Sequence, residues 1–160
     1  MGVQKVILLT TLLGVSPSVA NTDRVDRFEE LYCLANNIYF ESRNQPKLGR
    51  IAVGQVTMNR VNSKKFPNTV CKVIKQGGEK RNRCQFSWYC DGKGDDIPFY
   101  DRQVYRIAVE IARIIFFGQY NEDITSGATH YHANYVFPAW RKTKTKTLIV
   151  GDHIFYRWEK

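Results

Sequence analysis

The sequence predicts an α+β fold in one domain, with helices first and a small antiparallel sheet after them. Apolar residues recur at three- and four-residue steps, the period of a helix, in several stretches before residue 118. Short alternating runs, typical of strands, follow between residues 129 and 156. A length of 160 residues suits a single domain. Helices followed by a separate group of strands are typical of the α+β class.

The first helix is predicted to start near Phe28, after a short polar N-terminal segment at 21–27. Its apolar stripe passes through Leu34 and Ile38, and it should end before Pro46, because proline disfavours helical geometry in the preceding residue. Further helices are expected at about 48–61, at 68–74 with Asn68 as the N-cap, and at 102–117, where Gly118 ends the helix.

The strands are expected at 129–132, 147–150 and 153–156, where polar and apolar residues alternate. Between the helices and these strands, residues 75–101 are rich in glycine and charge and are expected to be mostly loop.

Residues 1–20 have the order of a secretory signal peptide. Lys5 precedes an apolar run at 6–15, Pro17 follows, and small residues at Ser18 and Ala20 suit a signal peptidase. The run is shorter than the roughly 20 residues of a membrane span. We expect cleavage after Ala20, which leaves an exported catalytic domain at 21–160. An uncleaved N-terminal anchor is the alternative.

The net charge of +9 favours an anionic partner, which could be nucleic acid, a membrane surface or an acidic wall polymer. The predicted export distinguishes between these three partners. A periplasmic or secreted protein rarely meets nucleic acid, and it meets the membrane only during export, whereas peptidoglycan carries carboxylates on its peptide stems. We therefore expect peptidoglycan as the partner, no nucleic acid, and a monomeric protein.

The cysteine pattern agrees with export, because an even number of cysteines in an exported chain suggests disulfides. Cys84 and Cys90 flank a short segment that can close locally, which leaves Cys33 to pair with Cys71. A zinc site is the competing use of these residues, but the sequence has no C-x-x-C spacing.

Glu41 is the strongest candidate for a catalytic group. It lies three residues after Ile38 and so continues the apolar stripe of the first helix. Burial there should raise the pKa of its carboxyl group, and a protonated carboxylic acid can protonate a glycosidic oxygen. The alternative is an ordinary glutamate at a helix end, turned to solvent or paired with Arg43.

Two tryptophans in loop-like stretches, Trp88 and Trp140, are candidates for a glycan-binding groove, because aromatic rings stack on the apolar faces of sugars. Packing in the core is the alternative for the aromatic residues as a group.

The histidines suggest a competing chemistry. His130 and His132 would share one face of a strand, and His153 is the only other histidine. Three histidines around Zn²⁺, with Glu41 as general base, would make a metal-dependent amidase. No H-E-x-x-H motif accompanies them, so we expect neither a metal nor another cofactor.

Several segments together resemble the SleB/CwlJ-type cell wall hydrolases. They are 33–43 (CLANNIYFESR), 52–61 (AVGQVTMNRV), 66–73 (FPNTVCKV), 84–88 (CQFSW), 128–132 (ATHYH), 138–140 (PAW) and 151–156 (GDHIFY). The resemblance covers about residues 31–156 and implies a fold similar to lysozyme and the lytic transglycosylases. It also implies Glu41 as the catalytic acid. Ser42 and Asn44 replace the family's usual alanine and glycine, and both substitutions are compatible with that role.

Members of this family are labelled as amidases in some cases and as lytic transglycosylases in others, so the resemblance by itself does not select the bond that is cut. From the candidate acids we expect cleavage of the glycosidic bond between N-acetylmuramic acid and N-acetylglucosamine. Glycosidases that use water normally need two carboxylates. No second acid lies in a matched segment; Asp91 is the nearest candidate, and Asp95 and Asp96 lie in a glycine-rich loop. A lytic transglycosylase needs only one, because the 6-hydroxyl of the muramic sugar attacks and forms a 1,6-anhydro ring. We therefore expect this reaction, with Glu41 as acid and then base.

Gln85, Ser87 and Tyr131 are expected to hold N-acetyl or hydroxyl groups of the substrate. Two other functions stay open from the sequence. One is the histidine-dependent N-acetylmuramoyl-L-alanine amidase, and the other is a wall-binding module that does not cut.

Overall fold

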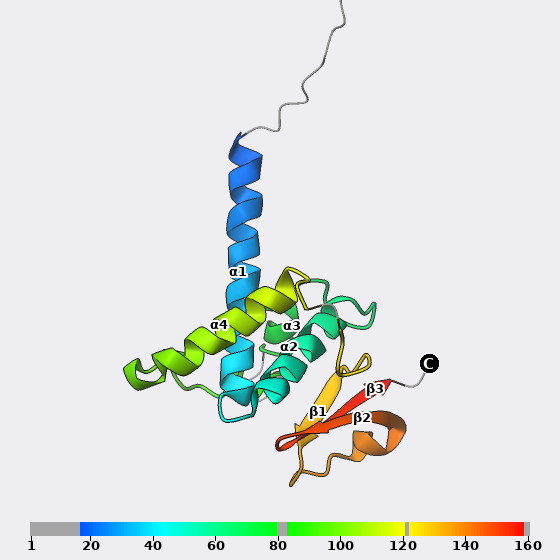
Figure 1. The fold of residues 1–160 in the computed structure, drawn as a ribbon. Helices are drawn as coiled ribbons and strands as arrows, with labels where there is room; N and C mark the ends of the chain where they lie inside the picture. Colours follow the sequence, from blue (N-terminus) through cyan, green and yellow to red (C-terminus); the bar gives the residue numbers. More distant parts are fainter. Residues whose placement is uncertain (1–16, 80–82, 121, 159–160) are drawn as a thin grey trace, which may run out of the picture.

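The computed structural model describes residues 17–79, 83–120 and 122–158, and it has the expected α+β architecture (Figure 1). Four helices, α1 (Pro17–Ser42), α2 (Lys47–Val61), α3 (Val70–Lys75) and α4 (Arg102–Phe116), precede the sheet. Figure 1 shows α4 crossing α1, and the N-terminal part of α1 extending away from the other elements. Three 3-10 turns, η1 (Ser87–Cys90), η2 (Phe99–Asp101) and η3 (Ala139–Thr143), complete the described elements.

Helix α1 is longer than predicted: the expected start near Phe28 was wrong, because the polar residues 21–27 also belong to the helix. Pro17 is the first residue of α1 within the described part of the chain. No glycine or proline follows before Ser42, so the packed C-terminal half can extend the helix outward through charged residues. Most of the proposed leader, residues 1–16, lies outside the described residues. Within the described part of the chain, none of the helices has the length and apolarity that a membrane span requires.

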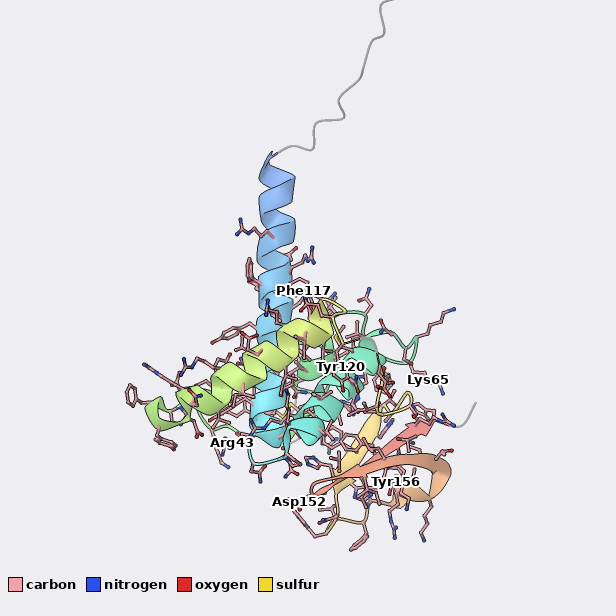
Figure 2. All side chains as sticks on the ribbon, in the orientation of Figure 1. Arg43, Lys65, Phe117, Tyr120, Asp152 and Tyr156 are labelled. Atoms are coloured by element: carbon pink, nitrogen blue, oxygen red, sulfur yellow. A yellow bond between two sulfur atoms is a disulfide. The ribbon has the colours of Figure 1, made fainter. Side chains whose placement is uncertain are left out.

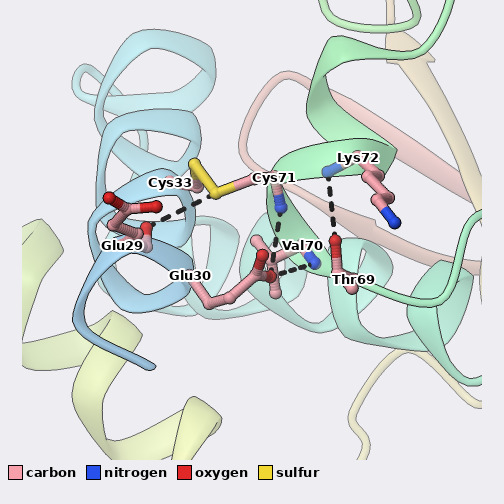
Figure 3. Close-up of a disulfide and its surroundings, with 7 residues drawn as sticks. All are labelled: Glu29, Glu30, Cys33, Thr69, Val70, Cys71 and Lys72. Atoms are coloured by element: carbon pink, nitrogen blue, oxygen red, sulfur yellow. Dashed lines mark hydrogen bonds between the residues drawn. A yellow bond between two sulfur atoms is a disulfide. The ribbon is translucent and has the colours of Figure 1, made fainter. Parts of the chain in front are cut away.

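The short helix α3 begins one residue later than predicted. Thr69, not Asn68, is its N-cap, and the Thr69 side chain accepts a hydrogen bond from the backbone N–H of Lys72. Glu30 of α1 also accepts hydrogen bonds from the backbone N–H groups of Val70 and Cys71 (Figure 3). A carboxylate there satisfies N–H groups that the helix itself leaves unpaired, so α1 and α3 are joined at this point.

The sheet consists of β1 (His130–Ala133), β2 (Lys144–Val150) and β3 (His153–Trp158), in the antiparallel order β1-β3-β2. Strand β2 starts earlier than predicted, because Lys144 already pairs with Trp158. In the pairing of β1 with β3, Tyr131 lies opposite Phe155. Alternate residues point to opposite faces of a sheet, so Tyr131 and Phe155 share one face.

That face packs on the helices. Phe155 is completely buried in a cluster with Ala52, Val53 and Val56 of α2. A larger core cluster joins α1, α3 and α4 through residues such as Leu34 and Ile38. The sheet is therefore held against α2, and Tyr131 is directed toward the C-terminal end of α1.

Both predicted disulfide pairings agree with the structure. Cys33 on α1 is bonded to Cys71 on α3, with a Cα–Cα distance of 5.3 Å (Figure 3). Cys84 is bonded to Cys90 with a Cα–Cα distance of 6.0 Å. The first bond holds two helices together, and the second closes the loop that leads into η1.

The two disulfides should differ in their effect on stability, because they close loops of 38 and 6 residues. Loop-closure entropy predicts a loss of about 4 kcal/mol for Cys33→Ser with Cys71→Ser, against about 2 kcal/mol for Cys84→Ser with Cys90→Ser. Urea unfolding of the two double variants measures this difference, and each serves as the control for the other. An equal or larger loss from the short loop would contradict the expectation.

Candidate active site

Glu41 lies at the C-terminal end of α1, beside a cleft of about 420 Å³. Ile38 and Leu34, one and two turns before it, are completely buried, as the apolar stripe predicted. The Glu41 side chain itself is partly exposed and lines the cleft. Phe40, Ser87, Trp88 and most of the loop at 91–96 form the other walls.

Tyr131 contacts the candidate acid directly. Its hydroxyl group donates a hydrogen bond of 2.7 Å to Oε2 of Glu41. The antiparallel sheet places Tyr131 on the helix-facing side of β1, where it also packs against Phe155. This bond orients the carboxyl group at the end of α1.

Burial raises the pKa of Glu41 above its ordinary value of 4.5. The hydrogen bond from Tyr131 and the positive charge of Arg60 act in the opposite direction, because both favour the ionised form. In turn, burial and the adjacent Glu41 charge raise the pKa of Tyr131 well above 10, so Tyr131 is protonated and acts as a donor. Glu41 therefore has two properties that an acid–base catalyst needs. Its pKa is raised, and neighbouring groups stabilise its ionised form.

Arg60 is a site residue to which the sequence analysis assigned no role. Its side chain is 4% exposed, and its Nε donates a 2.7 Å hydrogen bond to the carbonyl oxygen of Thr129, next to β1. The guanidinium lies over the rings of Phe66 and Phe86, at 5.4 and 4.8 Å from their centroids. Nη1 is buried without a hydrogen-bond partner in the described structure. The helical spacing could have revealed that Arg60 is buried, because Arg60 continues the apolar stripe of α2 four residues after Val56.

Trp88, a predicted groove residue, forms a rigid wall of the cleft. Its ring stacks on Phe40 with centroids 4.7 Å apart. Its Nε1 donates a 2.9 Å hydrogen bond to Asn37, whose amide donates in turn to Thr57 of α2. The indole is therefore anchored to both α1 and α2, and its remaining surface faces the cleft.

Acidic residues of the loop at 91–96 also line the cleft. Asp91, Asp95 and Asp96 all contribute to its wall. Burial, together with the charges of Asp91 and Asp96, raises the pKa of Asp95. The sequence analysis found no second acid in a matched segment, but the fold brings these three carboxylates to the same cleft as Glu41.

Two of the predicted substrate-binding residues lie elsewhere. Gln85 is exposed next to the buried Phe86 and is not among the residues that line the cleft. Trp140 packs against His130, His132 and Tyr156 on the face of the sheet opposite Tyr131. The structure thus brings Glu41, Ser87, Trp88 and Tyr131 together.

The three histidines do not converge. His130 and His132 occupy the face opposite Tyr131, where Nε2 of His132 lies 3.0 Å from the Tyr156 hydroxyl. His153 is on the other face and contacts the Tyr131 ring, with centroids 5.1 Å apart. Among the residues that the structure describes, no three His, Cys, Asp or Glu side chains form a group that could hold a metal ion. This geometry does not fit the zinc-dependent amidase.

The sequence is similar to a known family and to several curated proteins. The sequence model of the cell wall hydrolase family matches residues 44–156, so Glu41 lies just before the matched region. The spore cortex-lytic enzyme of Bacillus cereus is 34% identical over 128 residues, which are 79% of this chain and 43% of that protein. The enzyme of Halalkalibacterium halodurans is 29% identical over the same length, 34% of its chain. This chain therefore spans less than half the length of these curated relatives.

Two solved structures are similar. The catalytic domain of the Bacillus anthracis germination-specific lytic transglycosylase SleB is 28% identical with a TM-score of 0.61, and the match covers 92% of this chain and 100% of that one. The catalytic domain of the Bacillus cereus SleB protein is 29% identical with a TM-score of 0.58, covering 80% and 89%. The predicted lysozyme-like α+β fold is thus confirmed, and the chain belongs to the cell wall hydrolase family.

Proposed function

We propose that this chain is a lytic transglycosylase that cleaves the bond between N-acetylmuramic acid and N-acetylglucosamine in peptidoglycan. The observation that carries the proposal is Glu41 in the cleft, with a raised pKa and a hydrogen bond from Tyr131. The similarity to the SleB catalytic domain, which is described as a lytic transglycosylase, supports the same reaction.

In the first half of the reaction, protonated Glu41 donates its proton to the glycosidic oxygen. The bond between this oxygen and C1 of the muramic sugar breaks, and C1 gains oxocarbenium character. The leaving sugar departs with a free hydroxyl group. Glu41 becomes a carboxylate, which the Tyr131 hydrogen bond and the Arg60 charge stabilise.

In the second half, the Glu41 carboxylate removes the proton from the 6-hydroxyl of the same muramic sugar. The oxygen attacks C1 and closes a 1,6-anhydro ring, and Glu41 recovers the proton that it gave up. No water is consumed, so one carboxyl group is sufficient. In this proposal Ser87 and Trp88, which line the cleft, contact the sugars, with Trp88 as the fixed wall, and Tyr131 acts through its hydrogen bond to Glu41.

A second candidate is a hydrolysing muramidase, favoured by the aspartates of the loop at 91–96 in the same cleft. One of them could activate a water molecule while Glu41 acts as the acid, which is the two-carboxylate arrangement of ordinary glycosidases. Asp91, the nearest candidate in the sequence, would be the first residue to test.

The products distinguish these reactions. We expect muropeptides that end in 1,6-anhydro-N-acetylmuramic acid, lighter by one water than the products of hydrolysis, when purified peptidoglycan is digested and analysed by mass spectrometry. The digestion should proceed equally in EDTA, because the histidines do not converge on a metal. Reducing ends would indicate the muramidase. New alanine amino termini on intact glycan strands, with loss of activity in EDTA, would indicate the amidase.

We also propose that the protein is exported and meets peptidoglycan in the periplasm or outside the cell. The basic charge, the leader-like first 20 residues and the two disulfides support this location.

A further inference from the structure

A second hollow, of about 550 Å³, lies where the end of α2 meets the end of β3. Its lining includes Asn59, Ser63, Lys65, Ser126, Arg157 and Trp158. None of its lining residues is shared with the cleft of Glu41. Figure 2 labels Lys65 beside the C-terminal end of β3. We call this feature the basic hollow.

Two cations, Lys65 and Arg157, line the basic hollow, and a third, Lys144, contacts the Trp158 ring that forms part of its wall. The Nζ atoms of Lys65 and Lys144 lie 4.4 and 3.5 Å from the centroid of the Trp158 ring. Lys144 is held there because it pairs with Trp158 across the sheet, and Arg157 is the preceding residue of β3. Neither of the two ion pairs in the described part of the chain includes these cations. One indole therefore contacts two ammonium groups, and neither forms an ion pair with a carboxylate among the residues that the structure describes.

The lowered pKa values of two neighbouring side chains agree with a positive local field. Burial and the charge of Lys65 lower the pKa of Lys144. Burial and the charges of Arg60 and Lys144 lower the pKa of His130, whose ring contacts Trp158, to about 4. Like charges at close range are unfavourable, so an anion in the hollow would relieve the repulsion.

The backbone on the other side of the hollow has an uncommon conformation. Ser126, with φ of 52°, is the only non-glycine residue with positive φ among the described residues. Such conformations cost energy and occur often where a ligand is held. The carbonyl oxygen of Ser126 accepts a hydrogen bond from Nη1 of Arg157, which holds the guanidinium at the rim. The neighbouring Asp123 carboxylate is occupied by bonds from Asn59, Thr125 and Gly127.

We propose that the basic hollow is a second contact site for the wall polymer and binds a carboxylate of the peptidoglycan peptide stem. The inference rests on the proposed function, which makes peptidoglycan the substrate. Lys65 and Arg157 supply charged donors, and the hydroxyl of Ser63 supplies a neutral one. Binding a stem outside the Glu41 cleft would hold the glycan strand without occupying the position where the bond is cut.

The test measures binding in the Glu41→Gln background, so that cleavage does not remove the ligand. Purified sacculi are mixed with one of three proteins, all of which carry Glu41→Gln. The first has no other change, and the second, the hollow variant, also carries Lys65→Gln and Arg157→Gln. The third carries Lys72→Gln and Arg106→Gln instead and is a charge-matched control with changes at exposed helix positions. The bound fraction is measured by sedimentation. We expect the hollow variant to bind at least tenfold more weakly than the control, since a tenfold change corresponds to about 1.4 kcal/mol and the loss of a single charge-assisted hydrogen bond already costs about that much. Equal thermal unfolding of the variants shows that the fold is intact.

Two treatments of the wall identify the anion. Amidation of the stem carboxylates should weaken binding of the control and remove its advantage over the hollow variant. Removal of wall phosphates with hydrofluoric acid should leave that advantage unchanged. An advantage lost only with the phosphates would overturn the stem assignment, and equal binding of control and hollow variant, or no binding by either, would overturn the site itself. The binding result is independent of the bond that the intact enzyme cuts, which product analysis decides separately.

Discussion

Replacement of Glu41 by glutamine should abolish wall lysis while leaving the protein folded. The amide keeps the shape of the carboxyl group but can neither give nor take a proton, and loss of a general acid–base group costs about 100-fold or more in rate. Turbidity of a peptidoglycan suspension measures the activity. Glu110→Gln, which removes an exposed carboxylate of α4, is the matched control and should be fully active.

The same variant should be at least as stable as the unchanged protein at neutral pH. The pKa of Glu41 is raised in the folded state, so folding becomes less favourable as the pH rises from the ordinary value of 4.5 through the raised one. Glutamine carries no charge and removes this cost. An inactive variant with a clearly lower unfolding temperature would indicate a structural role, and a variant that still lyses the wall would refute the proposed mechanism.

Removal of the Arg60 charge should lower activity and shift its pH dependence. The Arg60 charge favours the ionised form of Glu41, so Arg60→Met should raise the pKa of Glu41 further. Activity that requires protonated Glu41 falls on the alkaline side as the acid ionises, and this fall should therefore move to higher pH in the variant. The rate should decrease by roughly tenfold or more, because the carboxylate that forms when Glu41 gives up its proton loses the stabilising charge of Arg60.

Arg60→Met should also lower stability by about 1–3 kcal/mol, because the carbonyl of Thr129 loses its donor in a buried position. Arg60→Lys separates the two effects, since it keeps the charge while losing the planar contact with Phe66 and Phe86. We expect this variant to keep the pH profile. Arg113→Met, on the exposed side of α4, is the control for loss of an arginine. A pH profile unchanged in Arg60→Met would restrict Arg60 to a structural role.

Local sequence patterns were sufficient to predict most of the helices and strands. The helical period predicted α2 and α4 to within one residue at each end, because amphipathic spacing reports directly which face is buried. The beginning of α1 was missed, since a charged helix that extends beyond the core carries no apolar period to detect. The cap of α3 was misplaced by one residue, because Asn68 and Thr69 are both good caps and only the backbone distinguishes them.

The site was partly predictable for similar reasons. Glu41 could be identified from its position on a buried stripe and from the segment around it, and Ser87, Trp88 and Tyr131 were also named before they were seen to lie near it. Trp140 could not be excluded from the cleft, because the sheet face on which it packs depends on pairing between strands far apart in sequence. The same pairing separates His153 from His130 and His132.

By itself, the sequence determined the order of helices and strands and the one carboxylate on a buried helical stripe. It also determined the two disulfide pairs, one through short spacing and the other by elimination. These are properties of neighbours along the chain, which periodicity and spacing report. Only the tertiary structure decided that Tyr131 donates to Glu41, that Arg60 supplies the nearby charge, and that the loop at 91–96 brings aspartates to the same cleft. Those contacts join residues from separate elements, and they arise because burial of Phe155 against α2 fixes the sheet beside the end of α1.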